Sequence, residues 1–327
     1  PGTERQLKGM NPGSPKHCGL EILSGTHIPP AWNGDLVTND FRGHRVCRFK
    51  IEPSGSAYAG RQQGEMIASS HVSFRPIDAK MGPDGAIYLA DWYNPIIQHG
   101  EVDFRDERRD RTHGRIWRIS FPDRSPDRWP DFVTLSIDEL LGLLTDPALP
   151  IRQFARQELW KRGAESPDQV LNAYRDWHVD DKANRTTELL WIHEALQQSI
   201  LKSGRKNATT IEQLHPAARR TAMRSVWRSR GLFSDQAANR VVSEVLKRSN
   251  DPDPRLRLEA VALAGTLAAD DYPAAVTAVL DALNHDVDLN IDFAIWQALR
   301  KLDASVTAGS ALELVPDWTN RLNQLSY

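Results

Sequence analysis

Six side chains able to take part in chemistry gather in one polar stretch of the chain. They are Asp91, Trp92, Tyr93, Asn94, His99 and His113. Histidine and aspartate can move protons or bind metals, whereas tryptophan and tyrosine can stack against a flat ligand. This stretch is therefore predicted to be a candidate site loop.

Each of these residues also has a structural interpretation. Aromatic residues such as Trp92 and Tyr93 fill the space beside a sheet, and Asp91 can cap the turn that follows a strand. His99 and His113 lie 14 residues apart with no third ligand at metal spacing, so they read equally as surface hydrogen-bonding residues. No metal site is predicted from them.

The segment between the two histidines is unusually charged. Residues 101–111 contain five acidic and four basic side chains, which indicates a self-paired solvated loop or, alternatively, a calcium site. The nucleophile, phosphate-binding, zinc-protease and dinucleotide motifs G-x-S-x-G, G-x-x-x-x-G-K, H-E-x-x-H and G-x-G-x-x-G are all missing from the sequence. The catalytic residues are therefore unknown at this stage.

The elements that must position this loop form an internal repeat. Gly34 and Gly85 start similar strands 51 residues apart, but the strands that follow, from Arg45 and Arg115, are 70 residues apart. The second copy thus carries 19 extra residues between its two strands. Short antiparallel strands repeated at this period are typical of propeller blades, and loops inserted into such rigid scaffolds commonly carry function.

The pattern changes from strands to helices along the chain. Strands are predicted at residues 19–23, 36–39, 46–51, 66–69, 77–81, 86–91 and 115–120. Three prolines then mark a linker, and helical periodicity follows. We predict a mixed, two-domain fold: the last blades of a β-propeller in residues 1–122, a linker in 123–135, and an α-helical HEAT-type solenoid in 136–327.

The helical half has its own repeat. Arg152, Arg185, Arg219 and Arg257 recur at spacings of 33, 34 and 38 residues, and an acidic or proline-containing turn precedes each. Helix pairs of this length with an aspartate in the turn and an arginine on the second helix are typical of HEAT arrays. The aspartate can cap the second helix and pair with the arginine.

Composition excludes some functions. The 41 basic and 43 acidic residues give no electrostatic reason to expect nucleic acid, and no apolar run reaches the length of a bilayer span. The two cysteines, Cys18 and Cys47, form no C-x-x-C motif and hence no haem site; they are either a disulfide or two buried thiols. Because the chain opens on Pro1, we expect it to be a fragment or a processed piece.

Several motifs carry a resemblance to a known family. They are residues 17–23 (HCGLEIL), 39–46 (NDFRGHRV), 74–78 (FRPID), 82–88 (GPDGAIY), 91–95 (DWYNP) and 112–116 (THGRI). Together they resemble the last blades of a bacterial membrane-bound dehydrogenase family. Its members have a propeller similar to that of quinoprotein (PQQ) sugar dehydrogenases, then HEAT repeats and often a c-type haem domain.

The resemblance implies an activity and a cofactor. It implies that the parent protein oxidises a sugar or related alcohol with PQQ and calcium, outside the cytoplasm or in the periplasm, and that HEAT repeats dock a protein partner. Arg42 and Arg75 match two cofactor-binding positions, but Ile77 stands where a third arginine is expected. The general base and the calcium ligands belong to earlier blades, so this chain alone is expected to be inactive. The alternative is a non-catalytic scaffold that binds carbohydrate or protein.

Overall fold

The computed structural model describes most of the 327-residue chain. The described residues are 16–97, 102–103, 105–176, 187–188, 191–192, 216–229, 235–267 and 272–304. The chain divides into two compact units, which are described separately: the first is formed by residues 1–53 and 58–157, and the second by residues 158–327 with 54–57.

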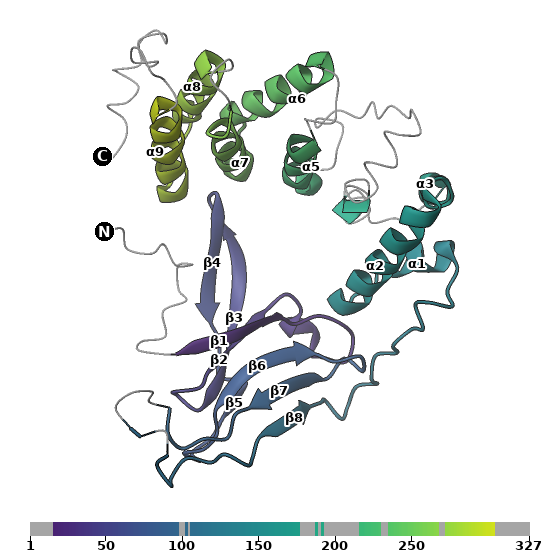
Figure 1. Ribbon diagram of the computed structural model, residues 1–327, viewed down its shortest axis with the longest axis vertical. Coiled ribbons are helices and arrows are strands. Elements are labelled where there is room, and N and C mark those ends of the chain that lie inside the picture. Colours follow the sequence, from purple (N-terminus) through teal and green to yellow (C-terminus); the bar gives the residue numbers. More distant parts are fainter. Residues whose placement is uncertain are drawn as a thin grey trace. The chain divides into compact units, whose positions relative to one another are not determined.

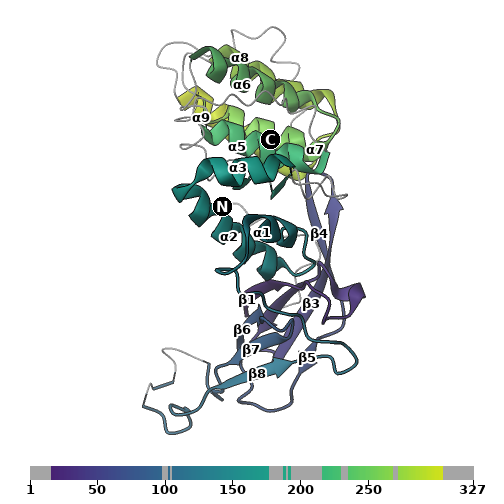
Figure 2. The ribbon, with the colours of Figure 1, turned by 90° about the vertical axis from the view of Figure 1, so that its right-hand side faces the viewer.

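The first unit contains two antiparallel sheets (Figure 1). The strands are β1 (His17–Ile22), β2 (Leu36–Asp40), β3 (Arg45–Ser54), β4 (Ala57–Gln62), β5 (Ile67–Ala68), β6 (Pro76–Met81), β7 (Ile87–Asp91) and β8 (Arg115–Ile119). One sheet has the order β1-β2-β3-β4, with β5 paired to β3, and the other has the order β6-β7-β8. Strand β6 contacts β1 and β2, so the two sheets lie side by side (Figures 1 and 2).

Alternating apolar residues explain why these two sheets pack together. Val37 and Val46 of the first sheet share one buried cluster with Ala79, Ile87 and Leu89 of the second, and all five are fully buried. In a strand, every second side chain points to the same face, so each sheet contributes one apolar face to this core. The core fixes the strand ends that carry the candidate site.

Helices follow the sheets. They are α1 (Ile137–Leu143), α2 (Leu149–Glu165), α3 (Pro167–Asp176), α5 (Pro216–Ser229), α6 (Asp235–Lys247), α7 (Pro254–Ala264), α8 (Tyr272–Asp281) and α9 (Leu289–Ala304), with short 3₁₀ turns at Pro30–Trp32, Arg248–Asn250 and Ala282–Asn284. Ser136 starts α1 with a capping box, in which its hydroxyl accepts from the Glu139 N–H and the Glu139 carboxylate accepts from the Ser136 N–H.

Helices α5 to α9 form two layers in the second unit. Helix α7 contacts α5 and α9 in one layer, and α6 and α8 pack against each other in the second layer and against α7 (Figure 1). Asp253 caps α7 as predicted, because its carboxylate accepts the Arg255 N–H. The predicted pairing of Arg257 with an aspartate carboxylate is wrong: this buried guanidinium donates to the carbonyls of Asp251, Pro252 and Asp286.

The order of strands followed by helices agrees with the sequence prediction. Every predicted strand is present, and each of the predicted bounds lies within a few residues of the observed ones. Strand β4 was missed, because its sequence, AYAGRQ, holds small and polar residues in place of alternating large apolar ones. Cys18 and Cys47 are free thiols, so the disulfide interpretation is wrong; Cys47 is buried as the alternative predicted, whereas Cys18 is half-buried.

Candidate functional site

Asp91 organises the start of the candidate site loop, at the end of β7. Its side chain is 3% exposed, and one carboxylate oxygen accepts the backbone N–H groups of Arg75 (2.8 Å) and Tyr93 (3.0 Å). The other oxygen accepts the indole N–H of Trp117, on β8, at 3.0 Å. A buried carboxylate with three donors is a rigid anchor. Asp91 therefore supports the site and does not face a ligand.

Arg75 lies beneath the loop and is almost fully buried. Each of its three side-chain nitrogens donates to a backbone carbonyl: Nε to Asn94 (2.8 Å), Nη1 to Phe41 (2.9 Å) and Nη2 to Pro95 (3.0 Å). Burial lowers the pKa of Arg75, and the nearby Asp91 charge opposes this effect. Arg75 thus ties the β2–β3 turn to the first residues of the long loop.

Tyr93 is the centre of an exposed group that we call the Tyr93 cluster, consisting of His71, Tyr93, His113, Arg115 and Trp117. The Tyr93 ring stacks with His71 (centroids 5.7 Å apart) and meets His113 edge-on at 6.1 Å. The Arg115 guanidinium lies 3.6 Å from the Tyr93 ring centroid and 5.7 Å from that of Trp117. The cluster joins aromatic faces to a cation.

The backbone at Tyr93 has an unusual conformation. Its φ is +53°, in the left-handed region that non-glycine residues rarely adopt. The hydrogen bond from the Tyr93 N–H to the Asp91 carboxylate holds the backbone in this conformation, and with it the Tyr93 ring. Strained residues that the surroundings fix in this way are often found at functional sites.

Asp110 and His113 form a second exposed pair at the end of the loop. His113 Nδ1 lies 2.8 Å from Asp110 Oδ2, and the other carboxylate oxygen, Oδ1, accepts the N–H of Thr112 at 3.0 Å. The hydrogen bond from the Thr112 N–H, together with the hydrogen bonds from His113, lowers the pKa of Asp110 to about 2. Asp110 thus holds the His113 ring that meets Tyr93 edge-on.

The remaining predicted residues lie apart from this cluster. Asn94 is buried and donates to the Asp110 carbonyl at 2.9 Å, so it joins the two ends of the loop. Trp92 is 38% exposed, and Arg42 is exposed in the tight β2–β3 turn. His99 lies outside the described residues. Residues Arg115 and His71 were not predicted as site residues; only the pairing of Arg115 with Asp91 across the repeat could have indicated the first.

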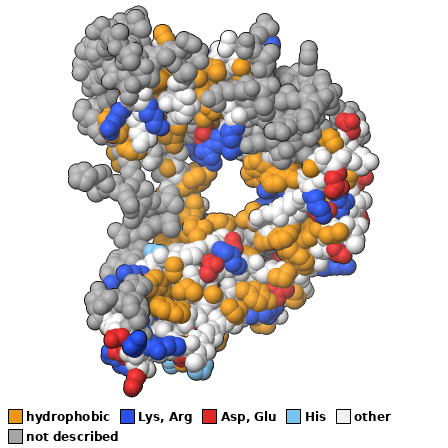
Figure 3. Space-filling model, in the orientation of Figure 1, with side chains coloured by type: hydrophobic (Ala, Val, Ile, Leu, Met, Phe, Trp, Pro, Cys, Tyr) orange, Lys and Arg blue, Asp and Glu red, His pale blue; other side chains and the backbone are white. Residues whose placement is uncertain are grey.

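The described part of the charged loop pairs with itself. Arg108 binds Asp106 at 2.8 Å, and acidic and basic side chains stand next to one another at this end of the sheets, at the lower left of Figure 3. Within the described residues, no group of three or more His, Cys, Asp or Glu side chains is placed to hold a metal ion. The Arg108–Asp106 pair supports the self-paired interpretation of residues 101–111 in the part that the structure describes, and the calcium alternative stays a prediction.

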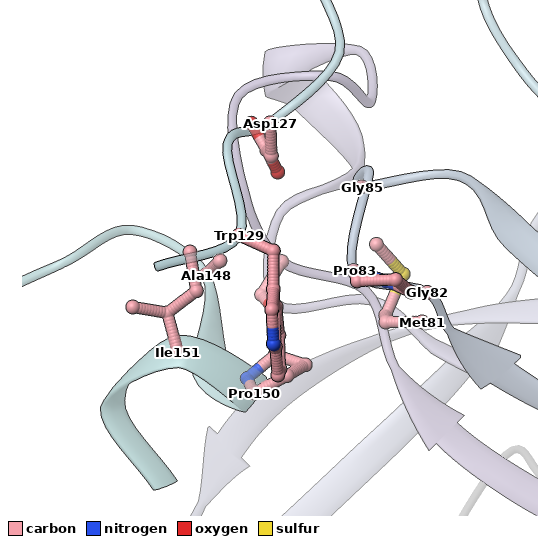
Figure 4. A pocket seen from close by; sticks show the side chains of 10 residues that line it. Met81, Gly82, Pro83, Gly85, Asp127, Trp129, Ala148, Pro150 and Ile151 are labelled. Atoms are coloured by element: carbon pink, nitrogen blue, oxygen red, sulfur yellow. The ribbon is translucent and has the colours of Figure 1, made fainter. Parts of the chain in front are cut away.

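A shallow crevice elsewhere in the first unit offers little room for a ligand. It encloses about 200 Å³, part of it open solvent, and Trp129 stands in it between the start of α2 and the Met81–Gly85 turn (Figure 4). Ala148 and Ile151 line the side formed by α2. The Tyr93 cluster, with its exposed cation and rings, is the stronger candidate site.

The chain was compared with known protein families and with curated proteins. A family described as a domain of unknown function (DUF7133) matches residues 8–123, which include both sheets and the Tyr93 cluster. No curated protein matches the chain. Among the described residues, no helix is both long and apolar enough to cross a membrane.

Proposed function

We propose that the sheet region is a binding module of a propeller-type scaffold and that it takes a sugar-like ligand at the Tyr93 cluster. The observation that carries this proposal is the Tyr93–Arg115–Trp117 arrangement. Trp117 is 44% exposed, next to a cation held against a second ring. Sugars offer C–H groups on one face and hydroxyls around the rim, which suit an aromatic face flanked by N–H donors.

Rigidity supports this proposal. The buried Asp91 accepts hydrogen bonds from the Trp117 indole and from the Tyr93 backbone N–H. Arg75 donates to the carbonyl of Pro95, two residues after Tyr93. A site already fixed in its binding geometry loses less conformational entropy when a ligand binds. The cluster is thus built for recognition, with its support buried and its rings exposed.

Of the two arginines that the resemblance assigns to PQQ, Arg75 does not fit this role. PQQ carries three carboxylates and requires free cationic donors, but Arg75 is 4% exposed and all three of its nitrogens donate to carbonyls. Ile77 supplies no charge, and Arg42 is exposed in a separate turn. No catalytic step is therefore assigned to this chain. Dehydrogenase activity stays a prediction for the parent protein.

The second unit is proposed to be a HEAT-type array that docks a protein partner. The support is the two-layer order of α5 to α9 and the position of Arg257, which links its own turn to the carbonyl of Asp286 in the next one. Ala260 of α7 and Ile295 of α9 are fully buried. Extended arrays of this kind commonly bind partners along one face.

A glycan array followed by calorimetric titration of the full chain tests the sugar-binding proposal. We expect a defined group of oligosaccharides to bind, and Trp117→Ala to weaken binding at least tenfold. Trp296→Ala is the matched control, because Trp296 is similarly exposed, at 37%, and lies 5.3 Å from an arginine, but on α9. Equal loss in both variants, or no binding by the folded wild type, would exclude the proposal. Saturable binding of added PQQ would restore the cofactor hypothesis.

A further inference from the structure

The two sheets contain the same Asp–Arg pair in two different states. In the β2–β3 ladder Asp40 stands opposite Arg45, and in the β7–β8 ladder Asp91 stands opposite Arg115. Arg45 binds the Asp40 carboxylate at 3.1 Å. Arg115 forms no ion pair within the described part of the chain, because Trp117 and two backbone N–H groups occupy the carboxylate of Asp91.

Arg115, which is not paired with Asp91, has a fixed position. Arg115 is exposed, and its guanidinium lies 3.6 Å from the centroid of the Tyr93 ring. A guanidinium stacked on a ring keeps its N–H groups at the edge of the plane, where they can meet the two oxygens of a carboxylate. The stack therefore prepares Arg115 for an anion.

The acidic side chains near Arg115 have other donors. Asp91 is buried and its oxygens accept three donors, and Asp110 accepts the backbone N–H groups of Thr112 and His113 and faces the His113 ring. Both carboxylates keep their charge, but their oxygens are hydrogen-bonded to these groups and not to Arg115. His71 and His113, on either side of Tyr93, add further polar ring nitrogens. Arg115 is the cation of the cluster without an acidic partner among the described residues.

We propose that Arg115 binds the carboxylate of an acidic sugar, so that the ligand of the Tyr93 cluster is a uronic-acid oligosaccharide. This inference rests on the proposed sugar-binding function. Trp117 supplies the aromatic face for the sugar ring, and the edge of the Arg115 guanidinium receives its carboxylate. Because Arg115 is not paired with Asp91, it can select acidic over neutral sugars.

A matched pair of ligands tests this inference. The full chain is titrated with tetragalacturonate and with the same tetramer after methyl esterification, which removes the charge and keeps the rings. We expect the acid to bind at least tenfold more tightly than the ester, with an advantage that shrinks at high salt. In Arg115→Gln we expect the advantage of the acid over the ester to disappear. Arg118→Gln, on the same strand and paired with Asp84, is the control.

The outcomes separate the two proposals. Equal binding of acid and ester by the wild type overturns the carboxylate assignment and leaves sugar binding in place. Failure of both ligands and of the wider glycan array overturns the proposed function itself. Tighter binding of a sulfated oligosaccharide than of the uronate would overturn the carboxylate in favour of a sulfate ester.

Discussion

The β2–β3 and β7–β8 hairpins are corresponding copies of the internal repeat, but their Asp–Arg pairs differ in chemistry. In the first, a tight turn follows Asp40, and the Asp40–Arg45 pair is closed. In the second, the turn is replaced by a long loop, and Trp117 takes the carboxylate that would otherwise hold Arg115. Position 47, which corresponds to Trp117, is a cysteine without such a donor. One aromatic substitution and one insertion thus turn a structural ion pair into a candidate site.

Arg75 connects the two hairpins, and its loss should have the largest effect. Arg75→Ala leaves the carbonyls of Phe41, Asn94 and Pro95 without their donor in a buried position. We expect the free energy of unfolding to fall by about 3–4 kcal/mol. Urea denaturation followed by circular dichroism measures this. Arg42→Ala, at an exposed position, should change stability by less than about 0.5 kcal/mol. Equal stability of both variants would show that Arg75 is no cross-link.

Asp40→Asn should break only the Asp40–Arg45 ion pair, with an effect on stability between those of the other variants. Burial raises the pKa of Asp40, but hydrogen bonds from Gly43, Lys16 and Arg45 outweigh it, so the pKa lies below its usual range. The carboxylate therefore stabilises the fold above the unfolded-state pKa, about 3.9, and loses this effect as pH falls through the lower folded-state value. We expect a loss of about 1.5–2 kcal/mol at pH 7.

The pH dependence provides the control for that variant. Denaturation at pH 7 and at pH 2.5 should give a difference between wild type and Asp40→Asn that narrows in acid. A constant difference would mean that the amide disturbs packing and that the charge of Asp40 contributes nothing.

Trp117→Phe should convert the open pair toward the closed one, with the smallest effect on stability. Without the indole N–H, one Asp91 oxygen is free to pair with Arg115, as Asp40 pairs with Arg45. We expect a stability loss of about 1 kcal/mol and a tenfold weaker binding of tetragalacturonate, equivalent to about 1.4 kcal/mol. Trp296→Phe is the control in the same titration. Unchanged acid binding would show that Trp117 does not govern the state of Arg115.

Most of the fold could be predicted from the sequence, because alternation and repeats are local signals. Strands β7 and β8 and their inserted loop followed from the offsets between the two copies. Strand β4 did not, because Ala57–Gln62 lacks alternating apolar residues. Propeller closure depends on contacts over long sequence separation, and no local pattern reports them.

The candidate site was predicted in part. Residue type and spacing identified Asp91, Tyr93 and His113, and the structure brings them into one region. The role of Arg75 was not predictable, since the sequence does not show whether the N–H groups of a guanidinium donate to buried carbonyls. Arg115 was missed for a related reason: its freedom depends on which partner Asp91 selects, and that is a property of the folded chain.

The two ends of the long loop are held by hydrogen bonds, and this has a consequence for protein engineering. Arg75 holds the carbonyls of Asn94 and Pro95, and Asn94 in turn holds the carbonyl of Asp110. We therefore expect both ends of the loop to keep their positions when residues 96–109 are replaced by other sequences. Peptides inserted there would be displayed beside a constant aromatic and cationic surface.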